Sequence, residues 1–320
     1  MRTQSAPFSV QVELVEGCNL RCPFCGLQGI RAEGPNKNFK FMDPSTLVYL
    51  MQQIVELRWN PRIEFAMHGE PTMHPNYVDM IRKAHEVAPH LQLMMTSNGG
   101  GLLRGDPVDN IVGLFLAGLR ILALDEYDGI NIVSKIRSRT ADIAHRGYSV
   151  FEYPAEPGGN PHRRVKDQFV TLMVDPSKAD KGTHSLITNH AGAAFPKNER
   201  QAGKRCHRPF RELSVRWDGN VAVCCNDWRG EYKTGNTNTD GLAAVWDGAA
   251  MDAARRKLYR GERDFGPCAG CDARSYRVGL LPDPMGHDEM PAPDAGTTTI
   301  IDAALAGPSY TPKVPRPWET

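Results

Sequence analysis

The chain is 320 residues long and carries 38 Lys and Arg against 37 Asp and Glu, a net charge of +1. This length can bury a sizeable core, and the balanced charge argues against tight nonspecific binding to nucleic acid. No run of residues approaches the roughly 20 consecutive apolar positions of a membrane-spanning helix. The N-terminal MRTQSAPFSV also lacks the apolar centre of a secretory signal, so we expect a cytoplasmic protein that makes no membrane contact.

Short apolar runs alternate with amphipathic segments in the first half of the chain. The runs predict six strands, at 8–15, 62–67, 91–97, 119–125, 148–153 and 168–174. Helical periodicity follows at 43–58, 76–88, 107–118 and 130–147, and Asp43 and Ser45 are N-cap candidates for the first helix. This alternation predicts an α/β fold with a parallel sheet. Six strands favour a partial, open (β/α)6 TIM-like barrel over a closed barrel of eight.

Polar or glycine-rich loops follow four of these strands. In parallel βα architecture, reactive groups lie on the loops after the carboxyl ends of strands. The loops are EGCNLRCPFCG at 16–26, HGEP at 68–71, SNGGG at 97–101 and DEYD at 125–128. We therefore expect these four loops to share one face of the molecule.

The pattern changes in the C-terminal part of the chain. Alternation in LSVRW and NVAVC about Asp218 and Gly219 predicts a β-hairpin, and 242–261 reads as an amphipathic helix. Residues 282–320 are rich in proline and poor in large apolar residues, which predicts an extended tail.

The eight cysteines form two groups with none between them. Without a secretory signal the compartment is expected to be reducing, so metal ligation is the leading use for the thiols. Cys18, Cys22 and Cys25 form a C-x3-C-x2-C array. Three thiolates can hold three corners of a four-iron, four-sulfur cluster and leave the fourth iron open to an exogenous ligand. A zinc knuckle with a remote fourth ligand, or thiols without a metal, are the alternatives.

CNLRCPFC after a first strand resembles the radical S-adenosylmethionine (SAM) superfamily, and the resemblance extends over residues 8 to 280. It implies that the open iron chelates the amino and carboxylate groups of SAM. One-electron reduction then cleaves SAM to methionine and a 5′-deoxyadenosyl radical, which abstracts hydrogen from a carbon. In such enzymes the cofactor carries the difficult step, while the protein orients the reactants and excludes water.

The resemblance also implies roles for the other loops. HGEP resembles the G-G-E-P loop that holds the methionyl ammonium, which implicates Gly69, Glu70 and Pro71. His68 replaces the first glycine of that loop, and we expect it to be structural. TSNG resembles the segment that contacts the ribose and carboxylate. The further cofactor-binding candidates are Ser97, Asn98, Asp125 and Phe24, the last of which either packs on the adenine or fills the core beside the cluster.

The C-terminal cysteines resemble the SPASM and twitch extensions of this superfamily. Cys206, Gly219 and Cys224 match the pattern C-x9-15-G-x4-C, and Cys268 and Cys271 complete four thiolates. This set implies one auxiliary [4Fe-4S] cluster of the shorter, twitch type, with a four-thiolate zinc site as the alternative. The expected domains are the barrel at 1–190, the auxiliary iron-sulfur domain at 191–281 and the tail at 282–320.

Cys225 is the eighth thiol. It is either a small buried residue or a hydrogen-atom donor that quenches a substrate radical and so inverts a carbon centre. The first functional hypothesis is oxidation or epimerisation of a small molecule, such as an aminocyclitol or sugar, with flavodoxin or ferredoxin as electron donor. The alternatives are maturation of a ribosomal peptide, remodelling of a modified nucleobase or amino-acid adduct on nucleic acid, and a non-catalytic iron-sulfur or zinc scaffold. Only 17 residues precede Cys18, which disfavours the N-terminal leader-binding domain of many peptide-modifying relatives.

Overall fold

The computed structural model describes residues 6–22, 25–29, 39–125, 131–153, 168–173, 189–194 and 203–273. These residues form one nine-stranded sheet with helices packed against it, together with a two-stranded sheet made of β2 (Val15–Glu16) and β3 (Lys40–Phe41). In the described part of the chain, none of the helices has the length and apolar character needed to cross a membrane. The expected tail at 282–320 and Phe24 lie outside the described residues.

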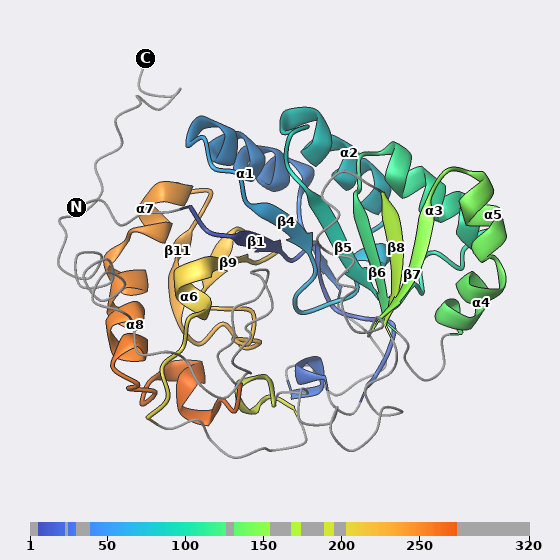
Figure 1. Ribbon diagram of the computed structural model, residues 1–320. Helices are drawn as coiled ribbons and strands as arrows, with labels where there is room; N and C mark the ends of the chain where they lie inside the picture. Colours follow the sequence, from blue (N-terminus) through green and yellow to red (C-terminus); the bar gives the residue numbers. More distant parts are fainter. Residues whose placement is uncertain are drawn as a thin grey trace, which may run out of the picture.

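All six predicted strands are confirmed, and they run parallel. They are β1 (Ser9–Val12), β4 (Arg62–Phe65), β5 (Leu93–Ser97), β6 (Ile121–Asp125), β7 (Ser149–Tyr153) and β8 (Phe169–Met173). Their order in the sheet is β1-β4-β5-β6-β8-β7. In Figure 1 the arrowheads of β5, β6, β7 and β8 point toward the side of the molecule that carries the short helix η1 (Gly26–Gly29).

The last two of these strands do not follow chain order. β8 pairs with both β6 and β7, so β7 forms the edge of the sheet. Burial explains this placement. Phe169 and Val170 of β8 are fully buried, whereas Ser149 and Glu152 of β7 are exposed. A strand that is apolar on both faces suits the interior of a sheet, and a strand with exposed polar positions suits an edge.

Five helices follow these strands along the chain: α1 (Pro44–Glu56), α2 (Tyr77–Val87), α3 (Pro107–Leu116), α4 (Ile132–Ser138) and α5 (Thr140–His145). The predicted cap of α1 is confirmed, because the Asp43 side chain accepts a hydrogen bond of 2.8 Å from the Ser45 N–H. The single helix predicted at 130–147 is instead two helices that meet at Arg139. These helices pack against one another in turn and form an arc along one side of the sheet (Figure 1).

The predicted hairpin consists of β9 (Glu212–Val215) and β10 (Asn220–Ala222), and Gly219 makes the turn at φ +81°. Its place in the sheet was not predicted. β9 pairs in parallel with β1, so the hairpin extends the barrel sheet. A further strand, β11 (Lys233–Asn236), pairs with β10; its sequence KTGN lacks the apolar alternation that would have revealed it.

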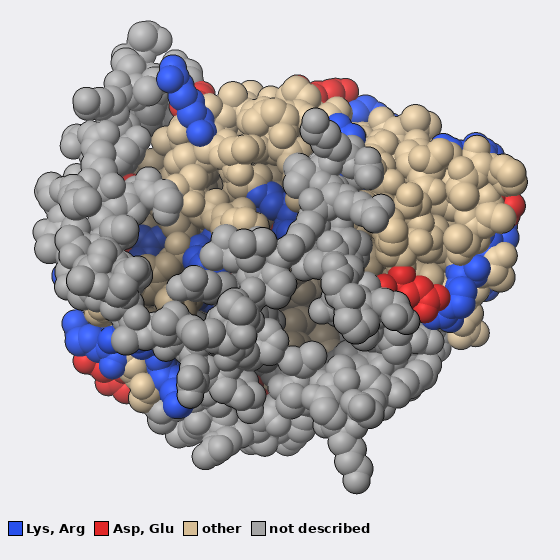
Figure 2. Space-filling view, in the orientation of Figure 1, with Lys and Arg blue, Asp and Glu red and all other residues tan. Residues whose placement is uncertain are grey.

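The remaining C-terminal elements are short. They are α6 (Arg208–Arg211), α7 (Leu242–Trp246), α8 (Ala249–Tyr259) and η6 (Gly266–Gly270). The helix predicted at 242–261 is thus divided by Asp247 and Gly248. On the described part of the face in Figure 2, Lys and Arg lie in separate small groups, several beside acidic residues, and form no continuous basic surface.

Candidate functional site

The predicted strand-end loops meet at one cavity. Its walls come from the loops after β1 and β4, from the ends of β5 and β6, and from two segments outside the barrel. The predicted residues among its lining are Cys18, Cys22, Cys25, Gly69, Glu70, Ser97, Asn98 and Asp125. Residues up to 107 positions apart in sequence therefore share one space, as parallel strands that end at one edge require.

Gly69 lies where two backbones approach each other closely. It forms a parallel β-bridge with Gly17, and the Glu70 N–H donates to the Gly17 carbonyl at 2.9 Å. A Cβ at position 69 would lie 2.0 Å from the Val15 carbonyl oxygen and 2.6 Å from that of Gly17. Only glycine fits here. Pro71 is buried at the start of η2 (Pro71–Met73), directly after the Glu70 cap.

Glu70 is 3 % exposed and ties the loop after β4 to the end of β5. One carboxylate oxygen accepts from the Ser97 hydroxyl at 2.6 Å, and from the backbone N–H and hydroxyl of Thr72 at 2.9 and 2.5 Å. The other accepts from the Asn98 N–H at 2.7 Å. Burial raises the pKa of Glu70, while these four donors act in the opposite direction. Ser97 thus holds Glu70 in place.

Asn98 reaches the first cysteine of the N-terminal loop. Its Nδ2 lies 3.3 Å from Cys18 Sγ and 3.0 Å from Asn19 Oδ1, and the Leu20 N–H donates to the same sulfur at 3.3 Å. Donors directed at a sulfur stabilise its thiolate form, which is the form that binds metal. Asp125, the last residue of β6, completes this side of the cavity.

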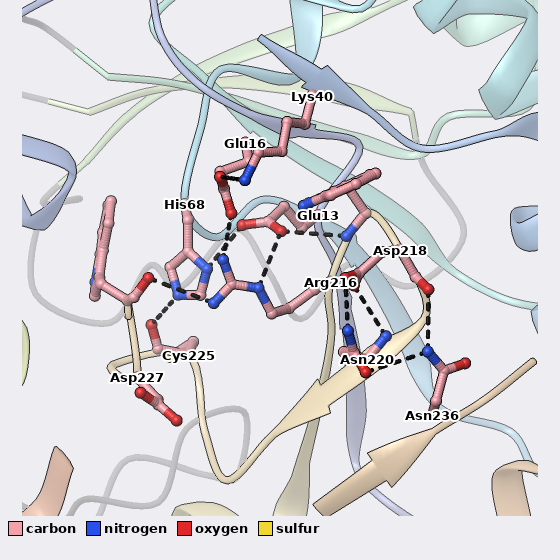
Figure 3. A network of polar contacts seen from close by, with 12 residues as sticks. Glu13, Glu16, Lys40, His68, Arg216, Asp218, Asn220, Cys225, Asp227 and Asn236 are labelled. Carbon is pink, nitrogen blue, oxygen red and sulfur yellow. Dashed lines mark hydrogen bonds and ion pairs between the residues drawn. The ribbon is translucent and has the colours of Figure 1, made fainter. Parts of the chain in front are cut away.

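His68 is fully buried, in agreement with the structural role expected for it. Its Nδ1 lies 2.7 Å from Glu13 Oε1, and its Nε2 lies 2.9 Å from the carbonyl oxygen of Cys225. Figure 3 shows the ring between these two partners. The guanidinium of Arg216 lies beside the carboxylates of Glu13 and Glu16. The loop after β4 is thereby joined to the loop that follows the hairpin.

His190 and Trp228 are among the cavity residues that were not predicted from the sequence. Their rings stack with centroids 4.6 Å apart at an angle of 17°. The Gly26 N–H donates to His190 Nδ1 at 2.8 Å, and a Cβ on Gly26 would lie 2.6 Å from the Trp228 ring. Burial, and then the charges of His68 and Arg208, lower the pKa of His190 to about 4. Neither residue belongs to a local motif, and only the tertiary fold brings them to the cysteine loop.

The four C-terminal cysteines lie close enough to one another to interact electrostatically. Burial, together with the thiols of Cys206 and Cys271, raises the pKa of Cys268 to about 12. Burial also raises the pKa of Cys224, and the neighbouring thiols of Cys225, Cys206 and Cys268 raise it further. The cationic side chains of Arg208 and Arg263 act against these shifts.

Both cysteine sets fit iron-sulfur groups. Three thiols surround a cavity that also contains polar groups, and four thiols gather beside two guanidinium groups that can offset the negative charge of a thiolate-bound cluster. Within the described ranges, no three His, Cys, Asp or Glu side chains converge on a point that would hold a single metal ion. A four-iron cluster takes one thiolate at each iron, so its ligands are arranged around a space and not at one point.

Cys225 directly follows Cys224, and its thiol lies beside the Arg208 side chain. Its Sγ accepts a hydrogen bond from Arg208 Nη1 at 3.1 Å. Burial raises its pKa to about 11, with Arg208, Glu212, Glu64 and Gln11 as the nearest polar influences. The thiol therefore faces residues of β1, β4 and β9 and does not form part of the cavity lining, whereas its backbone carbonyl reaches His68.

Comparisons with known proteins agree with this architecture. A model of the radical SAM superfamily matches residues 12–122, and a model of the SPASM iron-sulfur cluster-binding domain matches residues 206–272. An uncharacterized protein of Methanocaldococcus jannaschii is 29 % identical over 122 residues, which are 37 % of this chain; the chain spans 28 % of that relative.

Solved structures share the fold over most of this chain. A crystal structure of BtrN in complex with AdoMet and 2-DOIA has a TM-score of 0.63 at 20 % identity, covering 84 % of this chain and 94 % of BtrN. An open conformation of BtrN gives a TM-score of 0.57 at 18 % identity with the same coverage. At these identities the likeness shows the fold alone. From the two family models and the fold, the chain belongs to the radical SAM superfamily and carries a SPASM iron-sulfur cluster-binding domain.

Proposed function

We propose that this radical SAM enzyme abstracts a hydrogen atom from a carbon of a small-molecule substrate and thereby oxidises or epimerises it. When bound at Cys18, Cys22 and Cys25, a [4Fe-4S] cluster supplies the electron that cleaves SAM to methionine and the 5′-deoxyadenosyl radical. The observation that carries the proposal is the single cavity, in which these three thiols face Glu70, Ser97, Asn98 and Asp125.

The residues around the cavity bind and orient SAM. The loop of Gly69 and Glu70, which the bridge to Gly17 holds in place, would bind the ammonium of SAM. Asn98 and Asp125 provide polar contacts to its ribose and carboxylate. Trp228 and His190 cover the cluster loop and exclude water from the reacting atoms.

A small-molecule substrate is supported by the likeness to BtrN, whose crystal structure contains 2-DOIA and which this fold covers over 94 % of its length. Oxidation of a substrate radical to a closed-shell product requires loss of one electron and one proton. A single auxiliary [4Fe-4S] cluster at Cys206, Cys224, Cys268 and Cys271 would be the acceptor of that electron. A flavodoxin or ferredoxin of the cytoplasm would supply the electron that starts the reaction.

Epimerisation would instead require a hydrogen atom to be returned to the carbon from the opposite side. Cys225 is the proposed donor, because it is the one cysteine outside the two expected sets of cluster ligands. Its S–H bond would break as the substrate C–H bond forms, and one electron from the auxiliary cluster together with one proton would restore the thiol. We expect Cys225→Ala to form 5′-deoxyadenosine and consume substrate without releasing epimer. Unchanged epimer formation by this variant would contradict the assignment.

SAM cleavage tests the class of reaction directly. The anaerobically reconstituted protein is reduced with dithionite in the presence of SAM, and 5′-deoxyadenosine is quantified by mass spectrometry. Replacing Cys18, Cys22 and Cys25 by alanine should abolish its formation, whereas the matched single-thiol variant Cys225→Ala should retain it. Cleavage that persists without the three N-terminal cysteines would overturn the proposal.

A further inference from the structure

His68 occupies an unusual position for a buried histidine, because both of its ring nitrogens face acceptors. Nδ1 lies 2.7 Å from a Glu13 carboxylate oxygen, and Nε2 lies 2.9 Å from the Cys225 backbone carbonyl oxygen. A neutral imidazole has one donor and one acceptor nitrogen, whereas the imidazolium ion has two donors. A carbonyl oxygen cannot donate, and neither can an oxygen of a carboxylate, so with Glu13 as a carboxylate the two hydrogen bonds require a proton on each ring nitrogen.

The second oxygen of the Glu13 carboxyl group faces donors, as the oxygens of a carboxylate do. This oxygen accepts from the Trp217 N–H at 3.2 Å and lies 3.6 Å from Arg216 Nε. Arg216 also pairs with Glu16, which in turn binds Lys40 at 2.6 Å at the solvent-exposed end (Figure 3). The buried Glu13 carboxylate and the half-buried Glu16 carboxylate are thus matched by Arg216, Lys40 and the His68 ring. A buried carboxylate is retained when it is paired and hydrogen-bonded in this way.

The buried His74 and the half-buried His190 have different hydrogen-bond partners. His74 is 3 % exposed, and its Nε2 faces the Met42 carbonyl at 3.1 Å, but its Nδ1 accepts from the Asn76 N–H at 3.1 Å. His190 Nδ1 likewise accepts from the Gly26 N–H. Each of these rings has an acceptor nitrogen, so each is neutral. Of the three, His68 alone has acceptors on both sides.

The position of His68 links two functional regions. It directly precedes Gly69 and Glu70 in the cavity wall, while its partner Cys225 follows Cys224, a predicted auxiliary ligand. The ring also lies 4.8 Å from that of Trp228, with which a cation makes a favourable contact. We propose that His68 is a positioning residue, which as an imidazolium ion holds the backbone of Cys225 against the wall of the SAM cavity.

The protonation state is tested on the cluster-loaded, oxidised protein with nitrogen-15-labelled histidine. Both ring nitrogens of His68 should show chemical shifts typical of imidazolium, with the signals assigned by their loss in His68→Gln. The His74 signals should be those of a neutral ring and provide the internal reference. One unprotonated nitrogen on His68 would overturn the proposal.

The positioning effect is tested by alkylation of Cys225 with iodoacetamide, followed by peptide mass spectrometry. In the cluster-loaded protein the ligand cysteines are protected, so Cys225 is the thiol that reports on the loop. Loss of a charged hydrogen bond raises the population of locally open states about tenfold or more. We therefore expect at least that acceleration in His68→Phe, and a smaller one in His68→Gln, which retains one donor.

His74→Gln is the matched control, since it alters a buried histidine outside this link, and it should leave the Cys225 rate unchanged. Glu13→Gln, which removes the carboxylate partner, should accelerate alkylation and provides a second route if His68→Phe loads poorly with iron. Equal rates in wild type, Glu13→Gln and His68→Gln would contradict the proposal. These measurements do not require SAM cleavage, so their outcome is separate from that of the proposed function.

Discussion

Trp228, which follows the C-terminal hairpin, stacks on His190 with ring centroids 4.6 Å apart, and together they cover the Cys18–Cys25 loop. Because Trp228 is within the region matched by the SPASM model, that region supplies part of the wall of the cavity that Cys18, Cys22 and Cys25 line.

Trp228→Ala should remove this cover. Trp228 is 8 % exposed, and truncation of such a ring should lower the free energy of unfolding by about 3 kcal/mol. Iron should also be lost to a chelator faster than in wild type. Trp228→Phe retains a stacking ring, so its free energy of unfolding in urea and its rate of iron loss should lie between those of wild type and Trp228→Ala. Equal chelation rates in all three proteins would show that the ring does not protect the cluster.

Gly69→Ala should disable the cavity. The added methyl group would lie 2.0 Å from a backbone carbonyl oxygen, so the bridge between Gly17 and Gly69 must open. We expect SAM binding, measured by equilibrium dialysis, to weaken at least about tenfold, a cost of about 1.4 kcal/mol. The matched control is Gly113→Ala in α3, where no atom lies within 4 Å of the new methyl group. It should stabilise the protein by up to about 1 kcal/mol through helix propensity.

Glu70→Gln should weaken the junction between the loop after β4 and the end of β5. The carboxylate accepts hydrogen bonds from four donors. The NH2 group of an amide would face the donors at one of the two oxygens, and it cannot accept a hydrogen bond from them. The expected loss is about 1–3 kcal/mol in urea unfolding, together with weaker SAM binding. Glu152→Gln removes an exposed ion pair with Arg137 and should change stability by less than about 1 kcal/mol. A Glu70→Gln protein as stable as Glu152→Gln would contradict this role.

Removal of an auxiliary ligand tests the second cluster. Cys268→Ala should lower the iron content of the reconstituted protein from about eight to about four atoms per chain, because one of two four-iron clusters is lost. Cys225→Ala should leave iron unchanged. Iron and sulfide are measured together with zinc. If the wild type contains about four irons and one zinc, the auxiliary site is a zinc site instead.

The spacing of residues in the sequence was enough to predict most of the residues of the candidate site. The array of Cys18, Cys22 and Cys25 and the loop at 68–71 are local motifs that directly follow strands with strong apolar patterns. Their convergence then follows from parallel architecture, in which all strand ends face one edge. Gly69 was implicated by the resemblance of HGEP to the G-G-E-P loop, and the close approach of the Val15 and Gly17 carbonyl oxygens explains why glycine is needed there.

Only the tertiary structure decided which distant segments complete the site. His190 and Trp228 carry no local signal, and the pairing of β9 with β1 depends on which sheet edge remained open. The order of β7 and β8 depended on the relative burial of whole strands, which a single strand pattern does not reveal. His68 could be placed after β4 from the sequence, but its two acceptors come from residues 55 and 157 positions away. Such long-range hydrogen bonds arise from packing between elements, so a pattern in the sequence does not predict them.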